Sequence, residues 1–566
     1  MGEIAATTAD VLAEKFFAGL LELSPISATF WGFEEGEDRL DDWGPQGRDK
    51  ARGLYEEVLR EASALETPPA GTSPALSVED RITLDVMRVV CRIELEQQDQ
   101  RIDRLRVVDQ MDGAQTILPQ LASFQRIDTP ERLDRFLARL ADYPRFMNVC
   151  AELTREGLAA GLTAPRIVAE RTIAQLERLL ALPDDQSPVV QASKPAGPQD
   201  RDRIVEAVRK YVRPGDQAFL DALKGPYLAA TRAEGGLWSA PNGEQLYRTQ
   251  IRSWTSLDLD PAEVHRIGLE ELESLEQERR VISREMGFGD DTVKARQAIC
   301  SGPGRIPSRP EELVERARGQ IERALAASPT KFGRLPKAPC EVWPVEPFKE
   351  QDSPTAYYYA PAADGSRPGI YYVNTYHLAA RPFYSLASTT FHEAIPGHHF
   401  QLAIENELSE LNTFRRLGAR SVSGAYIEGW GLYAERLADE MGLYADAAER
   451  FGMLDGQSYR AARLVVDTGL HAFRWSRERA IAQMVSGGGL PETDAAIEVD
   501  RYLVMPAQAL CYKTGQREIT RLRELARSKL GPRFDIRAFH DQVLGHGSLP
   551  LASLTAQLPG WLGFEA

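Results

Sequence analysis

Apolar residues spaced three and four positions apart run through most of the sequence, and this spacing limits the folds open to the chain. The pattern is clear in segments 80–102, 129–147 and 161–182, where apolar residues recur among Glu, Arg and Ala. Residues with this spacing lie on one face of an α-helix, so each segment is predicted to form a long helix with one buried side. We therefore expect a mainly α-helical protein.

One stretch between Cys340 and His377 departs from the helical pattern. The peptides EVWPVEPF and TAYYYAPAADGSRPGIYYVNTYH alternate aromatic and β-branched residues, which favour strands. Asp364-Gly365, between the two tyrosine-rich runs, is typical of a tight turn. We predict a small antiparallel sheet over residues 340–377, directly before the most informative motif of the chain.

Two segments rich in Pro, Gly, Ser and Asp interrupt the helical pattern, at residues 66–74 and 182–200. Such compositions are typical of surface loops. The second segment is predicted to separate an N-terminal helical lobe, 1–185, from a catalytic region, 200–566. One continuous fold is the alternative.

Charge and cysteine content exclude several classes of protein. The chain carries 67 Lys and Arg against 83 Asp and Glu, a formal net charge of −16, so we expect no nucleic-acid partner. Five scattered cysteines form no C-x-x-C pair, which argues against a disulfide framework or a thiolate metal site. Residues 1–23 are predicted to form a first amphipathic helix, which is acidic where a signal peptide is basic. No window has the roughly 18 consecutive apolar residues of a membrane span. We expect a cytoplasmic protein with no membrane partner.

Histidine is scarce, with eight residues in 566, yet HEAIPGHH contains three of them, His392, His398 and His399. In the zinc motif H-E-x-x-H, two histidines one helical turn apart bind the metal, and the glutamate beside the first acts as general base. His392 and Glu393 match the first half of this motif. Pro396 stands where the second histidine belongs.

Pro396 cannot continue a regular helix, because its ring clashes with the carbonyl group of His392 and it has no N–H to donate. If the turn 394–397 bulges, His398 is brought to the place of the second ligand. His399 is the alternative ligand, on the same face of an ideal helix but about 10 Å along its axis. Ring nitrogens of two residues that far apart along the helix do not easily both come within about 2.0–2.1 Å of one zinc ion, so we favour His398.

A third ligand is expected from YIEGWGLYAERLADEMG, a predicted helix beginning near Tyr426. Glu428 is the better candidate, because the Gly-Trp-Gly that follows it is uncharged, and a carboxylate there is costly unless it is paired or coordinated. Glu435 is followed by Arg436, and a surface or structural ion pair explains it. The metal-site helices are thus expected over residues 386–440.

The blocks HEAIPGHHFQ, YIEGWGLYAERLADEMGLY, RLVVDTGLHAFRWSRERA, MPAQALCYKTGQREITRLRE and FHDQVLGHGSLPL resemble the bacterial domain-of-unknown-function 885 family, over nearly the whole chain. That family is in turn similar to the helical gluzincin metallopeptidases, including the carboxypeptidase Taq family. The resemblance implies a large two-lobed helical, zincin-like body with a deep cleft and a short sheet whose edge can pair with the substrate backbone. It also implies that His392, His398 and Glu428 bind zinc and that Glu393 is the general base.

Such a site predicts metal-assisted hydrolysis of an amide bond, with one zinc per chain. Glu393 is expected to take a proton from the attacking water and to return it to the leaving amine. Tyr512 or His471 is expected to donate a hydrogen bond to the developing oxyanion.

The expected function is that of a zinc metallopeptidase, a carboxypeptidase or oligopeptidase acting on small peptides. An arginine would bind a terminal carboxylate, and Arg420, Arg463 and Arg501 are equal candidates in the sequence. One alternative is a metal-dependent hydrolase of a small non-peptide amide. The other is a metal-free helical binding protein with a peptidase-like shell. For the histidine cluster itself, the alternative to a metal site is a helix N-terminus with histidines on its surface and a structural carboxylate nearby.

Overall fold

The structure, a computed structural model, describes residues 7–66, 76–195, 197–233, 235–302, 304–345, 350, 354–361 and 367–565. Within these ranges the chain is mainly helical and has one three-stranded sheet, as predicted. It divides into two compact units. The first contains Met1–Thr249, Leu470–Arg479 and Ala496–Pro506, and the second contains Gln250–Gly469, Ala480–Ala495 and Ala507–Ala566. The segment 182–200 therefore lies inside the first unit.

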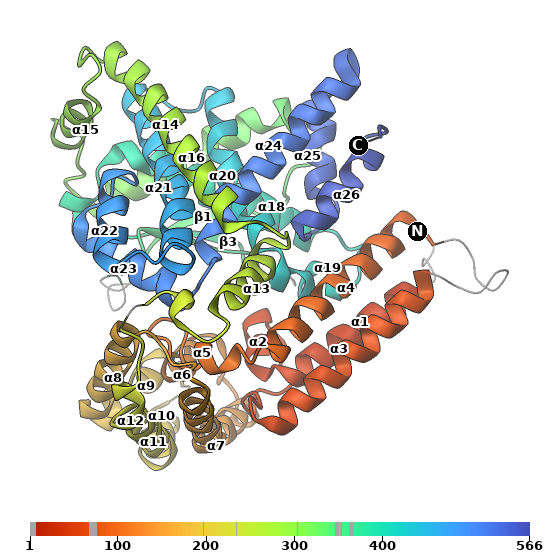
Figure 1. Ribbon diagram of the computed structural model, residues 1–566, viewed down its shortest axis with the longest axis vertical. Coiled ribbons are helices and arrows are strands. Elements are labelled where there is room, and N and C mark those ends of the chain that lie inside the picture. Colours follow the sequence, from red (N-terminus) through yellow and green to blue (C-terminus); the bar gives the residue numbers. More distant parts are fainter. Residues whose placement is uncertain are drawn as a thin grey trace. The chain divides into compact units, whose positions relative to one another are not determined.

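The first unit is a set of packed helices, among which α1, α3 and α4 run side by side (Figure 1). Its helices are α1 (Thr8–Leu23), α2 (Pro25–Trp31), α3 (Pro45–Glu66), α4 (Val78–Asp99), α5 (Asp103–Arg106), α6 (Ala114–Phe124), α7 (Pro130–Ala160), α8 (Arg166–Ala181), α9 (Pro188–Ala192), α10 (Pro198–Ala207), α11 (Arg213–Leu223) and α12 (Pro226–Ala229). The residues of α13 (Gly243–Thr255) belong to the first unit as far as Thr249 and to the second unit from Gln250. A π-helical turn, Val208–Val212, joins α10 to α11.

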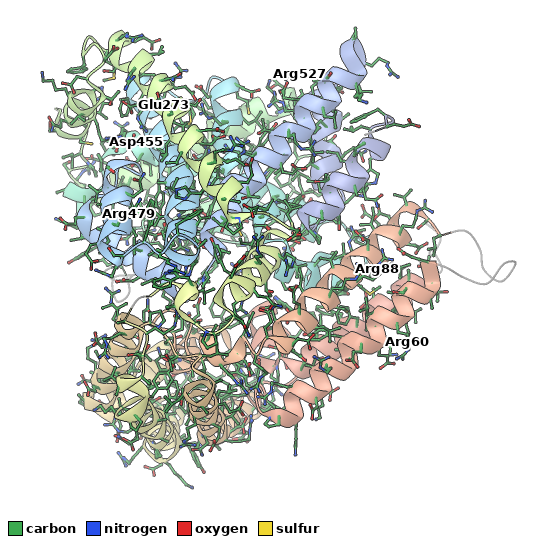
Figure 2. All side chains as sticks on the ribbon, in the orientation of Figure 1. Arg60, Arg88, Glu273, Asp455, Arg479 and Arg527 are labelled. Carbon is green, nitrogen blue, oxygen red and sulfur yellow. The ribbon has the colours of Figure 1, made fainter. Side chains whose placement is uncertain are left out.

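Capping residues fix where these helices begin, and ion pairs connect neighbouring helices. At the start of α4, the Ser77 hydroxyl accepts a hydrogen bond from the Asp80 amide at 3.0 Å, and the Asp80 carboxylate accepts one from the Ser77 amide at 2.9 Å. This reciprocal cap satisfies amide groups that have no partner within the helix. Arg88 on α4 then forms ion pairs with Glu66 of α3 and with Asp85 (Figure 2).

Two segments from late in the sequence join the first unit through a buried carboxylate. Asp500 is fully buried and pairs with Arg171 at 2.5 Å and with Arg477 at 2.6 Å. These bonds connect α8 to both returning segments. A buried carboxylate is tolerated because two guanidinium groups compensate it.

The second unit carries the motif helices and the sheet. Its helices are α14 (Pro261–Glu285), α15 (Thr292–Ser301), α16 (Pro310–Ala327), α17 (Leu386–Glu393), α18 (His398–Asn406), α19 (Thr413–Arg416), α20 (Gly424–Glu440), α21 (Ala447–His471), α22 (Arg477–Ser486), α23 (Glu492–Val504), α24 (Cys511–Leu530), α25 (Ile536–Leu544) and α26 (Leu551–Trp561). Residues of α21, α22 and α23 also belong to the first unit. Among the described residues, none of the helices is long and apolar enough to cross a bilayer.

Close helix contacts position the core of the second unit. α20 and α24 approach each other at Gly429 and Gly515, where a Cβ on Gly429 would lie 2.4 Å from the Gly515 backbone. On α21, Asp455 accepts hydrogen bonds of 2.6 and 2.8 Å from Arg296 of α15 (Figure 2). These contacts fix α20, α21 and α24, which surround the candidate site.

The sheet contains β1 (Cys340–Pro344), β2 (Ala356–Tyr359) and β3 (Gly369–Val373) in the order β1-β3-β2. β2 and β3 are antiparallel, with Ala356 opposite Val373, but β1 and β3 are parallel, with Cys340 opposite Gly369. The prediction of an antiparallel sheet is therefore wrong for β1. The chain reverses direction between β1 and β2 and again between β2 and β3, so β1 and β3 point the same way. Because β3 is the central strand, it pairs directly with β1, and that pairing is parallel. The expected Asp364-Gly365 turn lies outside the described residues.

Candidate metal centre

The motif HEAIPGHH forms two helices separated by a turn. α17 and α18 lie on either side of residues 394–397, and the peptide bond before Pro396 is cis. Gly397 has no room for a side chain, because a Cβ atom there would lie 1.9 Å from the carbonyl oxygen of His392. The interruption expected at Pro396 is thus a complete break between helices, rather than a bulge within one.

The turn is held by α20. The indole Nε1–H of Trp430 donates a hydrogen bond of 2.9 Å to the carbonyl oxygen of Pro396. Trp430 is fully buried, and its ring packs against Tyr433 with 5.5 Å between the centroids. Because α20 also carries Glu428, one helix positions both the turn and the third candidate ligand.

His392, His398 and Glu428 bring their side chains together in the second unit. Oε2 of Glu428 lies 3.6 Å from Nε2 of His392 and 3.5 Å from Nε2 of His398. One potential ligand atom from each residue lies within 4.8 Å of the other two. Tetrahedral zinc with bonds of about 2.0–2.1 Å separates its ligand atoms by about 3.3 Å. The two distances from Glu428 are close to this separation, and the donor set fits a zinc ion.

Gly431 makes the space in which the two imidazoles converge. A Cβ atom at this position would lie 2.8 Å from Nε2 of His392 and 3.0 Å from Cε1 of His398. Gly431 follows Glu428 by three residues on α20 and so shares its helix face. The Gly-Trp-Gly that predicted a tightly packed carboxylate thus has a specific steric role at the site.

Glu435 contacts the other nitrogen of His392 in a buried ion pair, and the sequence interpretation is wrong in the partner, which is not Arg436. Its Oε1 lies 2.9 Å from Nδ1 of His392, and its Oε2 accepts a hydrogen bond of 2.9 Å from the Ser388 hydroxyl. Arg436, the expected ion-pair partner, pairs instead with Glu278 at 2.7 Å. A carboxylate on the far nitrogen of a histidine ligand fixes its orientation and raises its basicity.

The charges of the site stabilise one another. Burial lowers the pKa of His392, but hydrogen bonds with Glu428 and Glu435 outweigh it and raise that pKa to about 9. Burial raises the pKa of Glu428, yet hydrogen bonds with His392 and His398 outweigh it, so the pKa is lowered overall. Glu428 is therefore ionised at neutral pH, the form in which a carboxylate binds a metal.

His399, the alternative second ligand, faces the sheet. Its Nδ1 accepts a hydrogen bond of 2.8 Å from the Tyr358 hydroxyl, and its Nε2–H donates one of 3.0 Å to the Ala338 carbonyl oxygen. Burial lowers its pKa to about 4. Both ring nitrogens have partners away from the three converging donors.

The two expected oxyanion donors lie in different settings. Tyr512 on α24 is beside the site, with 6.4 Å between its ring centroid and that of His392. His471 belongs to the first unit, where its Nδ1 accepts from the Leu237 amide at 3.1 Å and its Nε2–H donates to the Tyr502 carbonyl oxygen at 3.0 Å. The His471 ring has no N–H left for an oxyanion, so Tyr512 is the better candidate.

Glu393, the expected general base, is the last residue of α17 and is half-buried. Its carboxylate has no hydrogen-bond partner within the described part of the chain. Because Glu393 directly follows His392, its carboxylate is able to bind a water molecule or a substrate group close to the three converging donors.

The structure separates the three arginines that the sequence left equivalent. Arg420 pairs with Glu405 at 2.8 Å, and Arg501, in the first unit, pairs with Glu498 at 2.8 Å. The guanidinium carbon of Arg463 lies 4.4 Å from the ring centroid of Tyr512. Of the three, Arg463 is the one placed beside a candidate site residue.

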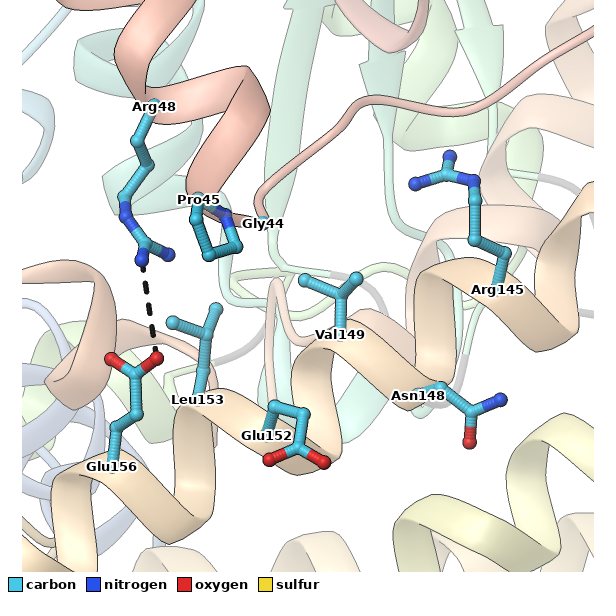
Figure 3. A pocket seen from close by; sticks show the side chains of 9 residues that line it. All are labelled: Gly44, Pro45, Arg48, Arg145, Asn148, Val149, Glu152, Leu153 and Glu156. Atoms are coloured by element: carbon cyan, nitrogen blue, oxygen red, sulfur yellow. Dashed lines mark ion pairs between the residues drawn. The ribbon is translucent and has the colours of Figure 1, made fainter.

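A pocket of about 410 Å³ lies in the first unit, between α3 and α7 (Figure 3). Its charged side chains have partners, such as Arg48 and Glu156, whose charged atoms are 3.9 Å apart. Among the described residues, the side chains that converge as potential metal ligands are those of His392, His398 and Glu428, and none of these three residues lines the pocket.

Two solved structures share the fold. A protein of Colwellia psychrerythraea, provisionally described as a lipoprotein, is 28% identical, with 98% of each chain covered and a TM-score of 0.88. A protein of Shewanella oneidensis, provisionally described as a lipoprotein of unknown function, is 18% identical, with a TM-score of 0.77 over 98% of this chain and 100% of the other. No curated protein sequence matches the chain.

The family expected from the sequence blocks is confirmed. The family model described as bacterial protein of unknown function, DUF885, matches residues 25–558. The match includes the HEAIPGHH turn, α20 and α24. The chain therefore belongs to the DUF885 family.

Proposed function

We propose that this protein is a zinc-dependent metallopeptidase that hydrolyses small peptides. The observation that carries the proposal is the convergence of His392, His398 and Glu428, with donor atoms within 4.8 Å of one another. Two histidines and a carboxylate are the protein ligands of many catalytic zinc sites, which keep a further position for water or substrate. Zinc bound there supplies Lewis acidity, which polarises a carbonyl group and makes a water molecule more acidic.

The side chains around the ligands support amide hydrolysis. Glu393 has a carboxylate able to accept the proton of the attacking water and to donate it to the leaving amine. Tyr512 carries a hydroxyl able to stabilise the oxyanion of the tetrahedral intermediate. Glu435 keeps the ring of His392 in a fixed orientation through its 2.9 Å contact with Nδ1.

A positive charge near Tyr512 supports a carboxypeptidase within this class. The guanidinium carbon of Arg460 lies 5.9 Å from the Tyr512 ring centroid, and Arg460 forms no ion pair with any described residue. A guanidinium of this kind binds a carboxylate strongly. Arg460→Gln should therefore raise KM for peptides with a free C-terminus and leave KM for C-terminally amidated peptides unchanged. An equal rise for both peptides would favour an oligopeptidase.

The cytoplasmic location stays a prediction. The Colwellia psychrerythraea relative is provisionally described as a lipoprotein. Fractionation of cells that produce this protein distinguishes a cytoplasmic from a membrane-attached chain.

The function is tested by incubating the zinc-loaded protein with small peptides and with acylated amines. We expect cleavage of peptides, inhibited by a chelator and restored by zinc. Glu393→Gln should retain zinc and lose activity by about 10²–10⁴-fold, because an amide cannot accept the proton. Cleavage of acylated amines alone, or full activity of Glu393→Gln, would contradict the proposal.

A further inference from the structure

A lysine is buried behind the metal centre. Lys513 on α24 is 1% exposed, and its ammonium group donates hydrogen bonds of 2.8 Å to Oε1 of Gln457 and 2.7 Å to Oε1 of Gln516. A carboxylate oxygen of Glu271 lies 3.6 Å away. A lysine with so little exposure is rare unless it has a specific partner.

The lysine acts together with the carbonyl oxygen of Leu432, which accepts a hydrogen bond of 3.1 Å from Nε2 of Gln457, to fix which way the amide of Gln457 points. An ammonium group only donates hydrogen bonds, so Gln457 must present its oxygen to Lys513 and its NH₂ group to the opposite side. The NH₂ group of Gln516 also donates to Oε1 of Gln457, at 2.8 Å. Gln457 is fully buried, so solvent does not offer it another arrangement.

The fixed amide in turn fixes Glu435. Nε2 of Gln457 donates a hydrogen bond of 3.1 Å to Oε2 of Glu435, the oxygen that also accepts from the Ser388 hydroxyl. Both partners of this oxygen are donors, so Glu435 accepts on this side. Its other oxygen lies 2.9 Å from Nδ1 of His392 and is free to accept the Nδ1–H.

Metal binding requires His392 to release its Nε2 proton; the proton that stays on Nδ1 then faces Glu435, and Nε2 presents its lone pair. Nε2 of His392 is the atom 3.6 Å from Glu428. Lys513 thus donates to Gln457, Gln457 donates to Glu435, and Glu435 accepts the Nδ1–H of His392, so the contacts favour the tautomer of this ring that has its proton on Nδ1.

We propose that Lys513 is a positioning residue that, through Gln457 and Glu435, holds His392 in the tautomer able to bind a metal through Nε2. The inference rests on the proposed zinc site. The proposed role needs only a hydrogen-bond donor at position 513, so a neutral side chain with an N–H group can replace the lysine. If the role depended on the positive charge of Lys513, a neutral side chain could not replace it.

The test compares zinc affinities of full-length variants by competition with a chromophoric chelator. Lys513→Met removes the donor and should weaken zinc binding by roughly tenfold, at the lower end of the effects of residues that support metal ligands. Lys513→Gln keeps an N–H donor and should bind zinc within about twofold of the wild type. The absorption bands of bound Co²⁺ should shift in Lys513→Met and remain unchanged in Lys513→Gln.

Arg523→Met is the matched control, because it also removes a buried cation from α24. Arg523 pairs with Glu440 and Tyr433, not with Gln457, so this variant should keep the wild-type zinc affinity. Gln457→Met is a second variant should Lys513→Met fail to fold. It should weaken zinc binding at least as much, because it removes the donor to Glu435 itself.

The outcomes separate this inference from the proposed function. A wild-type chain that takes up no zinc overturns both. A wild-type chain that binds zinc, with unchanged affinity in Lys513→Met or in Gln457→Met, overturns the inference alone. Equal losses in Lys513→Met and Lys513→Gln also overturn it, because they would mean that charge and not donor character matters.

Discussion

Buried histidines at the metal centre and elsewhere in the protein differ in what faces their ring nitrogens. His392 is 2% exposed and faces the carboxylates of Glu428 and Glu435. His471 and His540, 1% and 0% exposed, face backbone groups and, at His540, a tyrosine hydroxyl. Burial is nearly equal in the three cases, so it does not separate a candidate ligand from a structural histidine.

The partners of each ring account for its charge. Burial lowers the pKa of all three rings. Two carboxylates outweigh burial at His392 and raise its pKa to about 9. Backbone carbonyl groups compensate burial only weakly, so the pKa falls to about 3 at His471 and at His540. A buried histidine ring is therefore stabilised in its charged form where its partners are carboxylates.

The largest expected effect comes from closing the space between the imidazoles. Gly431→Ala puts a Cβ 2.8 Å from Nε2 of His392, so zinc affinity should fall by more than the roughly 100-fold upper range for residues that only support ligands. Gly319→Ala on α16 is the control, because the nearest atom to its Cβ, Nη1 of Arg323, is 3.9 Å away. Isothermal titration with zinc measures both. Wild-type binding by Gly431→Ala would mean that the rings do not converge at α20.

A smaller loss is expected when a carboxylate partner of His392 becomes neutral. Glu435→Gln removes the charge that faces Nδ1 and should weaken zinc binding by roughly 10–100-fold. Glu440→Gln, also on α20, serves as the control because Glu440 pairs with Arg523 and does not contact the site. Chelator competition gives both affinities. Equal affinities would show that the carboxylate at Nδ1 is structural only.

The smallest effect is expected at a histidine without carboxylate partners. The pKa of His540 is about 3 in the folded protein and about 6.5 in the unfolded chain, so the unfolded state binds more protons as the pH falls below 6.5. The stability contributed above pH 6.5 is lost as the pH falls toward 3, by about 2 kcal/mol between pH 6.5 and 5. His540→Gln should lose correspondingly less stability over this interval in urea unfolding. An identical loss in both proteins would contradict the low pKa.

Short-range spacing made most of the site predictable. HEAIPGHH places His392 and His398 within seven residues of each other, and Pro396 cannot continue a regular helix, which predicted that His398 turns toward His392. Glu428 stands in an uncharged context that disfavours a lone carboxylate. Helical periodicity likewise predicted the mainly α-helical fold, because each buried face is encoded locally.

Long-range packing was not predictable from the same patterns. Arg436 follows Glu435 in sequence, but neighbours in a helix point to different faces, and Glu435 instead shares the face of Glu428, seven residues earlier. That spacing is the signal that could have identified it. The parallel pairing of β1 depends on strand order, which the alternation within each strand does not specify. The position of His471 depends on Leu237, more than two hundred residues away.

Zinc binding by the wild type, His398→Ala and His399→Ala tests the account most directly. Elemental analysis and zinc titration of the purified proteins should give one tightly bound zinc per wild-type chain. His398→Ala should lose most zinc affinity, whereas His399→Ala, whose ring nitrogens face Tyr358 and Ala338, should change it by roughly 10–100-fold at most. A wild-type chain without zinc after reconstitution, or a larger loss in His399→Ala than in His398→Ala, would contradict the account.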